Sequence, residues 1–155
     1  MIKNIILDVG KVLVAWEPKQ QMRELGFSDA TVDAVAKALF DTGIWNETDR
    51  GVLSDEEFLA LAFRHAPQYE KEIMLFWENV DKAIWQLPYA REWICAMKRA
   101  GYNVYILSNY GSWTYKKTRE NALNFLEDVD GALFSFQVKQ IKPNADIFHS
   151  LFEKF

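Results

Sequence analysis

Cysteine is nearly absent from this chain of 155 residues, in which Cys95 is the one thiol. A single cysteine excludes a disulfide framework and a zinc site built from cysteines, and it is typical of a reducing compartment. No apolar run approaches the roughly 20 residues that a membrane-spanning helix needs. The first residues lead into a strand-like segment, without the layout of a secretory signal. We therefore expect a cytoplasmic protein.

Charge of one sign is not concentrated anywhere in the sequence. Lys and Arg number 18 and Asp and Glu number 22, which gives a formal net charge of −4 without a basic block. Nucleic acids and anionic membranes attract basic patches, so we expect neither as a partner. Hydrophobic residues make up 50% of the chain. That share is enough to bury a core and excludes disorder as the main state.

Three apolar runs predict the strands of a parallel sheet, at residues 5–9, 102–107 and 132–136. Each run is short and rich in β-branched or aromatic residues, as strands buried on both faces are. Segments with helical periodicity separate the runs, and no hairpin signal joins them. This order predicts an α/β protein with a Rossmann-like parallel sheet.

Apolar stripes at helical spacing predict the helices. In residues 88–100, Ala90, Trp93, Ile94 and Met97 share one stripe, and Gly101 follows as a stop. Ser54, followed by Glu57 three residues later, is a capping box. Similar spacing predicts further helices within residues 32–39, 73–84 and 114–124, and a last helix whose first turn holds Pro143.

The segment between Val14 and Pro88 looks helical throughout and has no strand signal. A crossover between parallel strands needs only about a dozen residues, far fewer than this segment contains. We therefore expect a helical cap inserted after the first strand. Its predicted extent is 16–87, and residues 1–15 and 88–155 form the predicted α/β core.

Polar residues follow each of the three predicted strands. Asp8 comes at the end of the first, Ser108 and Asn109 end the second, and Lys142 follows the third. The carboxyl ends of parallel strands meet at one edge of a sheet, where ligands bind. The three ends would bring a carboxylate, a hydroxyl and a cation around a small anionic group. Taken singly, each residue also fits an ordinary turn, helix cap or solvated side chain.

Three segments resemble, in the correct order, the motifs of the haloacid dehalogenase (HAD) superfamily: ILDVGKVLV at 6–14, VYILSN at 104–109 and KPNADIF at 142–148. The helical insertion resembles the family's cap domain, and DRGVLSDEEF at 49–58 resembles a cap segment of one phosphatase-like branch. The glycine two residues after Asp8 is shared with the glucose-1-phosphate phosphatase-like branch. The resemblance covers essentially the whole chain.

The resemblance implies a hydrolase that acts on a small phosphorylated metabolite. Asp8 would attack the phosphoryl group and form an aspartyl-phosphate, which water then hydrolyses. Ser108 would hydrogen-bond the transferring group and Lys142 would balance its charge. Mg²⁺ would be held by Asp8 and the backbone carbonyl of Gly10.

Three further residues are candidates for substrate binding. Asn109 stands beside Ser108, Lys11 adds positive charge next to Asp8, and Trp45 lies in a loop-like stretch of the cap. Each residue also fits an ordinary role: Asn109 as a turn residue, Lys11 as an exposed lysine and Trp45 as a core aromatic residue.

The chain departs from the family pattern in two places. Position 10 is glycine where many phosphatases of the family carry a second Asp as general acid and base. This leaves a 2-haloacid dehalogenase as an alternative. No acidic pair follows a strand after Lys142, so we expect a truncated hydrolase that binds Mg²⁺ weakly or not at all and turns over slowly or not at all. A non-catalytic binding module is a further alternative, and self-association through an open sheet edge is expected.

Overall fold

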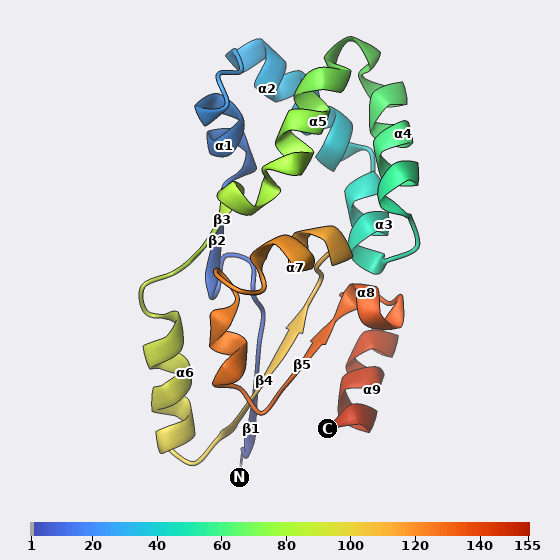
Figure 1. The fold of residues 1–155 in the computed structure, drawn as a ribbon. Helices are drawn as coiled ribbons and strands as arrows, with labels where there is room; N and C mark the ends of the chain where they lie inside the picture. Colours follow the sequence, from blue (N-terminus) through green and yellow to red (C-terminus); the bar gives the residue numbers. More distant parts are fainter. Residues whose placement is uncertain (1) are drawn as a thin grey trace.

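The structure is a computed structural model that describes residues 2–155. Figure 1 shows a sheet-containing half at one end of the molecule and a bundle of short helices, α1–α5, at the other. The strands are β1 (Asn4–Leu7), β2 (Val14–Trp16), β3 (Ile84–Gln86), β4 (Asn103–Ser108) and β5 (Gly131–Phe134). The helices are α1 (Pro18–Glu24), α2 (Asp29–Ala36), α3 (Ile44–Arg50), α4 (Asp55–His65), α5 (Glu70–Glu78), α6 (Ala90–Arg99), α7 (Ser112–Thr118), α8 (Ser135–Val138) and α9 (Ala145–Lys154).

The main sheet has three parallel strands in the order β1-β4-β5. Leu7 is the register partner of Ile106, and Ser108 is the partner of Phe134, so the strands end close together at one edge. Val104 and Ile106 pack with the apolar side of α6, while Leu107 packs with α9. The α/β class predicted from the sequence is confirmed, with helices on both faces of the sheet.

A second apolar cluster lies within the helical half. Phe58, Phe76 and Met22 are fully buried there, together with the apolar sides of α2 and α5. The predicted capping box begins α4: Glu57 N–H donates to Ser54 Oγ over 3.2 Å, and Ser54 N–H donates to the Glu57 carboxylate over 2.8 Å. The helical cap predicted from the sequence is therefore present.

The segment between residues 14 and 88 is not helical throughout, contrary to the sequence prediction. β2 and β3 pair antiparallel, with Trp16 opposite Ile84, and form a two-stranded ribbon between the two halves. The helix predicted within residues 73–84 ends early: α5 stops at Glu78, and the chain passes through a 3₁₀ turn into β3 at Ile84. The pairing partner of each strand is far along the chain, so no local pattern marks either strand.

Several predicted boundaries also differ. The predicted third strand ends at Phe134, and the next residues form α8. The helix predicted at 114–124 is instead α7, followed by a separate 3₁₀ turn at Asn124–Glu127. Pro143 precedes the last helix, whose N-cap is Asn144, rather than lying in its first turn. Trp93 is 42% exposed although it was predicted on the buried stripe of α6.

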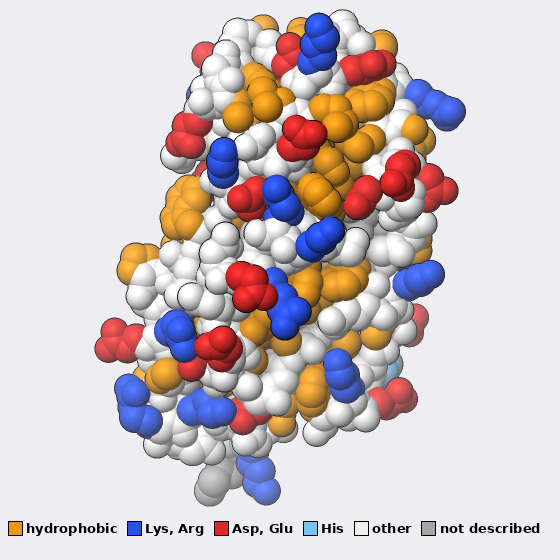
Figure 2. Space-filling view, viewed as in Figure 1, with side chains coloured by type: hydrophobic (Ala, Val, Ile, Leu, Met, Phe, Trp, Pro, Cys, Tyr) orange, Lys and Arg blue, Asp and Glu red, His pale blue; other side chains and the backbone are white. Residues whose placement is uncertain are grey.

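The surface carries charges of both signs. On the face in Figure 2, acidic and basic side chains alternate around apolar patches, and neither sign dominates. Across residues 2–155, no helix combines the length and the apolar character that crossing a membrane requires. Among these residues β1 pairs with β4 alone, so its other edge is open.

Candidate active site

Asp8 lies directly after β1, at the carboxyl edge of the main sheet. Its Oδ1 accepts a hydrogen bond of 2.8 Å from the backbone N–H of Val9, and its Oδ2 lies 2.9 Å from Lys142 Nζ. The Asp8 side chain remains 45% exposed. The carboxylate is therefore held at both oxygens by donors and is still open to a ligand.

Lys142 is fixed at the end of β4 by contacts with Leu107 and Asn109. Its Nζ donates to the Leu107 carbonyl over 2.9 Å, in addition to its contact with Asp8. Its backbone N–H donates to Asn109 Oδ1 over 2.8 Å, and Asn109 Nδ2 donates back to the Lys142 carbonyl over 3.1 Å. The amide of Asn109 therefore ties the Lys142 segment to the sheet, a role that the sequence did not indicate.

A cavity of about 250 Å³ lies beside these groups, between the sheet edge and the cap. The core side of the cavity supplies polar groups, and the cap side supplies an aromatic wall. In this wall the ring centroids of Trp16 and Trp45 lie 5.5 Å apart. The lining residues are Asp8, Gly10, Val14, Trp16, Trp45, Asp49, Ile84, Ser108, Asn109, Tyr110, Gly111, Thr114 and Lys142. The volume suits a small substrate.

The structure brings most of the predicted site residues to this cavity. Asp8, Ser108 and Lys142 line it, as do Asn109, Trp45 and the backbone at Gly10. Ser108 is almost fully buried, and its only hydrogen bond among the described residues is a long one, 3.4 Å to the Asn109 carbonyl. Its hydroxyl is thus available to a bound ligand.

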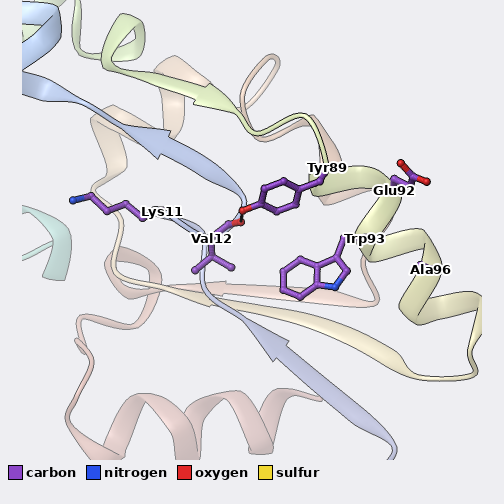
Figure 3. A pocket seen from close by; sticks show the side chains of 6 residues that line it. All are labelled: Lys11, Val12, Tyr89, Glu92, Trp93 and Ala96. Atoms are coloured by element: carbon purple, nitrogen blue, oxygen red, sulfur yellow. Dashed lines mark hydrogen bonds between the residues drawn. The ribbon is translucent and has the colours of Figure 1, made fainter.

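Lys11 lies elsewhere. It borders an open apolar hollow beside α6, together with Val12, Tyr89 and Trp93, and its side chain points away from the two aromatic rings (Figure 3). The Tyr89 hydroxyl donates to the Val12 carbonyl over 2.8 Å, and the two aromatic rings pack edge to face. The substrate-binding role expected for Lys11 therefore has no support from the shape of the cavity.

Asp49, near the end of α3, is a cavity residue to which sequence reasoning gave no role. The residue is half-buried, and its carboxyl lies against the backbone of Gly111. Burial raises the pKa of Asp49 to about 7, against the opposing effect of a hydrogen bond from the Gly111 N–H. Its place in the segment DRG was visible in the sequence, but nothing local showed that the carboxyl faces a cavity.

Two contacts fix the end of α3 on the core. Ser135 at the start of α8 donates its hydroxyl proton to the Asp49 backbone carbonyl and accepts a 2.9 Å bond from the Tyr110 N–H. Gly51 ends α3 in the left-handed region at φ 77°, where a Cβ would lie 2.8 Å from the Phe136 carbonyl oxygen. The position of Asp49 is therefore set by close contact between cap and core.

The oxygen donors available to a metal ion are few. Within the described part of the chain, no three His, Cys, Asp or Glu side chains gather as a possible metal cluster. Asp8 and Gly10 both line the cavity, with a carboxylate on the first and a backbone carbonyl as the one oxygen of the second. Such hard oxygen donors suit Mg²⁺ in kind, but they are fewer than a tightly bound ion requires.

No protein-family model matches the sequence, and the search of curated proteins found no match. Solved structures do match. A HAD family enzyme of Bacteroides thetaiotaomicron, in complex with magnesium and inorganic phosphate, aligns over 99% of this chain and 79% of its own, with 22% identity and a TM-score of 0.74. A HAD-like family hydrolase predicted in Porphyromonas gingivalis aligns over 99% of this chain and 76% of its own, with 21% identity and a TM-score of 0.70.

A dehalogenase has the same fold. L-2-haloacid dehalogenase from Xanthobacter autotrophicus, solved with chloropropionic acid covalently bound, aligns over 100% of this chain and 65% of its own. The identity is 13% and the TM-score 0.66. The chain therefore has the fold of the HAD-family enzymes, as the resemblance in its sequence predicts.

Proposed function

We propose that this chain is a HAD-like hydrolase that removes phosphate from a small phosphorylated metabolite. The observation that carries the proposal is the contact of 2.9 Å between Asp8 Oδ2 and Lys142 Nζ in a cavity that Ser108 also lines. A carboxylate, a hydroxyl and a fixed cation around one small space suit nucleophilic displacement at phosphorus. The phosphate-bound neighbour from Bacteroides thetaiotaomicron supports this choice.

The reaction has two steps. An Asp8 oxygen attacks the phosphorus atom, the bond from phosphorus to the substrate oxygen breaks, and an aspartyl-phosphate forms. Water then attacks this intermediate and releases inorganic phosphate. Lys142 balances the charge of the phosphoryl oxygens, and the Ser108 hydroxyl donates a hydrogen bond to one of them. The glycine at position 10 favours the glucose-1-phosphate phosphatase-like branch within this proposal.

Mg²⁺ is the cofactor that fits this donor set. It would be held by Asp8, the Gly10 carbonyl, the substrate phosphate and several waters, and it would neutralise phosphoryl charge when bound. Because only one carboxylate serves it among the described residues, we expect weak binding and slow turnover. The neighbour crystallised as a magnesium complex supports the choice of ion.

A 2-haloacid dehalogenase is the second candidate. Gly10 supplies no acid, and a departing halide needs none. Asp8 would displace the halide from carbon and form an ester, which water would hydrolyse. The apolar walls at Trp16 and Trp45 suit a short halogenated acid, and the dehalogenase neighbour supports this reading.

One pair of assays tests the proposal. Phosphate release from p-nitrophenyl phosphate and chloride release from 2-chloropropionate are measured with excess Mg²⁺ and with EDTA. We expect phosphate release that EDTA suppresses, that Asp8→Asn abolishes, and that the exposed cap substitution Asp41→Asn leaves unchanged. Chloride release that resists EDTA would instead support the dehalogenase. Binding of phosphate without release from either substrate would support a non-catalytic module.

We also propose a division into core and cap at the boundaries expected from the sequence, 1–15 with 88–155 and 16–87. The separate apolar clusters in the two halves support it. Most of the cavity's polar groups would then come from the core, whereas Trp45 and Asp49 would come from the cap.

A further inference from the structure

The proposed reaction needs a proton donor, and position 10 holds a glycine with no side chain. When a phosphate ester is cleaved, an alkoxide leaving group departs slowly unless an acid protonates it. The titratable side chains that line the cavity are Asp8, Asp49, Tyr110 and Lys142. Asp8 is the nucleophile and is paired with Lys142. The donor must therefore be Asp49 or Tyr110 if it comes from the described residues of this cavity.

Tyr110 is a poor donor. The residue is 7% exposed, and its hydroxyl is hydrogen-bonded to Thr118 Oγ1 over 2.9 Å. Burial raises the pKa of Tyr110 far above its usual range, and the neighbouring Asp49 charge raises it further. A phenol that holds its proton this tightly does not exchange it during turnover at neutral pH.

We propose that Asp49, carried by the cap helix α3, is the general acid and base of the reaction. The inference rests on the proposed phosphatase function and names the residue that would replace the missing acid at position 10. The Asp49 carboxyl lies close to Gly111, and the α3 backbone is anchored by Ser135. Figure 1 shows α3 beyond the carboxyl ends of β4 and β5, and Asp49 on this helix lines the cavity.

The ion pairs formed by the described residues do not include Asp49. On its own helix, Arg50 lies 3.5 Å from Glu47, and from the core Lys142 pairs with Asp8. On α7, the helix after Gly111, Lys117 pairs with Asp81. Burial without a bonded cation raises the pKa of Asp49 to about 7. Near neutral pH a carboxyl with this raised pKa is protonated in part of the molecules and ionised in the rest. It can therefore donate a proton in one step and accept a proton in the other.

The proton balance closes over the two steps. In the first, Asp8 bonds to phosphorus, the ester oxygen leaves with its electron pair, and the Asp49 carboxyl protonates it to give the free alcohol. In the second, water attacks the aspartyl-phosphate, and the Asp49 carboxylate takes the proton that the water loses. Asp8 is released as a carboxylate with inorganic phosphate, and Asp49 is protonated again.

Two substrates that differ only in their need for an acid test the proposal. Glycerol 2-phosphate releases an alkoxide, whereas p-nitrophenyl phosphate releases a stable anion. We expect Asp49→Asn to lower kcat/KM for glycerol 2-phosphate by about 10²–10⁴-fold. The first turnover of p-nitrophenyl phosphate should proceed at nearly the normal rate. Later turnovers should stall with phosphorylated protein, because no base activates water.

The exposed cap variant Asp41→Asn is the matched control and should behave as the unsubstituted protein does. The unsubstituted protein gives a second test. Its kcat/KM for glycerol 2-phosphate should fall as the pH rises through about 7. The first turnover of p-nitrophenyl phosphate should show no such fall. An Asp49→Asn protein that cleaves glycerol 2-phosphate normally, or that loses the first turnover of both substrates equally, would overturn the inference alone. Failure of the unsubstituted protein to release phosphate from either substrate would overturn the proposed function with it.

Discussion

At the scale of single residues, the proposed function depends on the Asp8–Lys142 pair, which would decide whether the cavity binds an anion. Asp8 brings a negative charge that repels phosphate, and Lys142 Nζ, 2.9 Å from its Oδ2, compensates for it. Asn109 and Leu107 fix the lysine from the neighbouring strand, so the cation is held in place before substrate arrives. A preorganised charge of this kind stabilises the transition state more than a mobile one does.

Removing this cation should impair chemistry more than folding. We expect Lys142→Gln to lower kcat/KM for p-nitrophenyl phosphate by about 10²-fold or more. The Asp8 side chain is 45% exposed, so water can solvate it and the fold should persist. Steady-state phosphate release measures the effect, and the exposed lysine nearby gives the control Lys139→Gln, which should leave the rate unchanged. Equal rates for Lys142→Gln and the unsubstituted protein would contradict the assignment.

Asp49 should also make the free energy of unfolding depend on pH. Its pKa rises from 3.8 to about 7 on folding, chiefly through burial, so the folded state keeps a proton that the unfolded state releases between these values. The free energy of unfolding should therefore fall as the pH rises through this window. The loss is on the order of a few kcal/mol. Urea unfolding at a series of pH values should show the fall, and Asp49→Asn should remove this contribution. Parallel pH dependence in the two proteins would contradict the burial of this carboxyl.

The residues that sequence reasoning placed at strand ends line one cavity in the structure. Asp8, Ser108 and Lys142 were located because parallel strands end at one edge. Asp49 was not found, since its contact with the cavity depends on how α3 packs against α8, which no local pattern encodes. Lys11 borders the hollow beside α6 rather than this cavity, because neighbours in sequence after a tight turn can face opposite sides of the sheet edge.

At the scale of elements, α3 connects the cap to the core at the candidate site. Its last turn brings Asp49 to the cavity, and Gly51 ends the helix where the Phe136 backbone passes closely. Such a close approach at a positive φ accepts only glycine. The geometry of the site therefore depends on one helix terminus as much as on the side chains that line the cavity.

A comparison of Gly51→Ala with Gly26→Ala should separate two costs in stability, the crowding of a side chain against Phe136 and the strain of a left-handed backbone. At Gly26 the φ is 89° and a Cβ would meet nothing within 4 Å, so Gly26→Ala should cost about 1–2 kcal/mol from the left-handed backbone alone. At Gly51 a Cβ would also lie 2.9 Å from the Phe136 Cα, so the loss should be larger. Urea denaturation compares the two variants. Equal losses would mean that α3 and α8 do not approach as closely as described.

Sequence patterns predicted some of the elements and missed others. The periodic helices and the central strands were predicted, because burial imposes a period along each of them. The ribbon of β2 and β3 was missed, because its two short strands are stabilised by pairing across about 70 residues of sequence rather than by their own pattern.

At the scale of the whole molecule, two apolar clusters lie on either side of Trp16, which lines the candidate cavity. The sheet cluster and the cap cluster both include Trp16 at their margins, so this residue packs on both sides. In the sheet half, β1 has an open edge among the described residues, and Ile6 on this strand is 39% exposed. An uncovered strand edge with an apolar side chain is a site for pairing with a second copy.

We expect this edge to make the protein self-associate. Sedimentation velocity should show an average mass that rises with protein concentration, and Ile6→Lys should suppress the rise because a charge on an edge strand opposes pairing. Leu75 on α5 is equally exposed, at 39%, and lies in the cap. Leu75→Lys is therefore the matched control and should associate normally. A concentration-independent monomer would contradict the expectation.

The most direct test of the catalytic account is to trap phosphorylated Asp8. After brief reaction with p-nitrophenyl phosphate and excess Mg²⁺, the protein is quenched in acid and the peptide that contains residues 4–11 is examined by mass spectrometry. We predict a phosphoryl group on Asp8, more of it in Asp49→Asn, and none in Asp8→Asn. Continued phosphate release with no modified Asp8, or turnover by Asp8→Asn, would contradict the account.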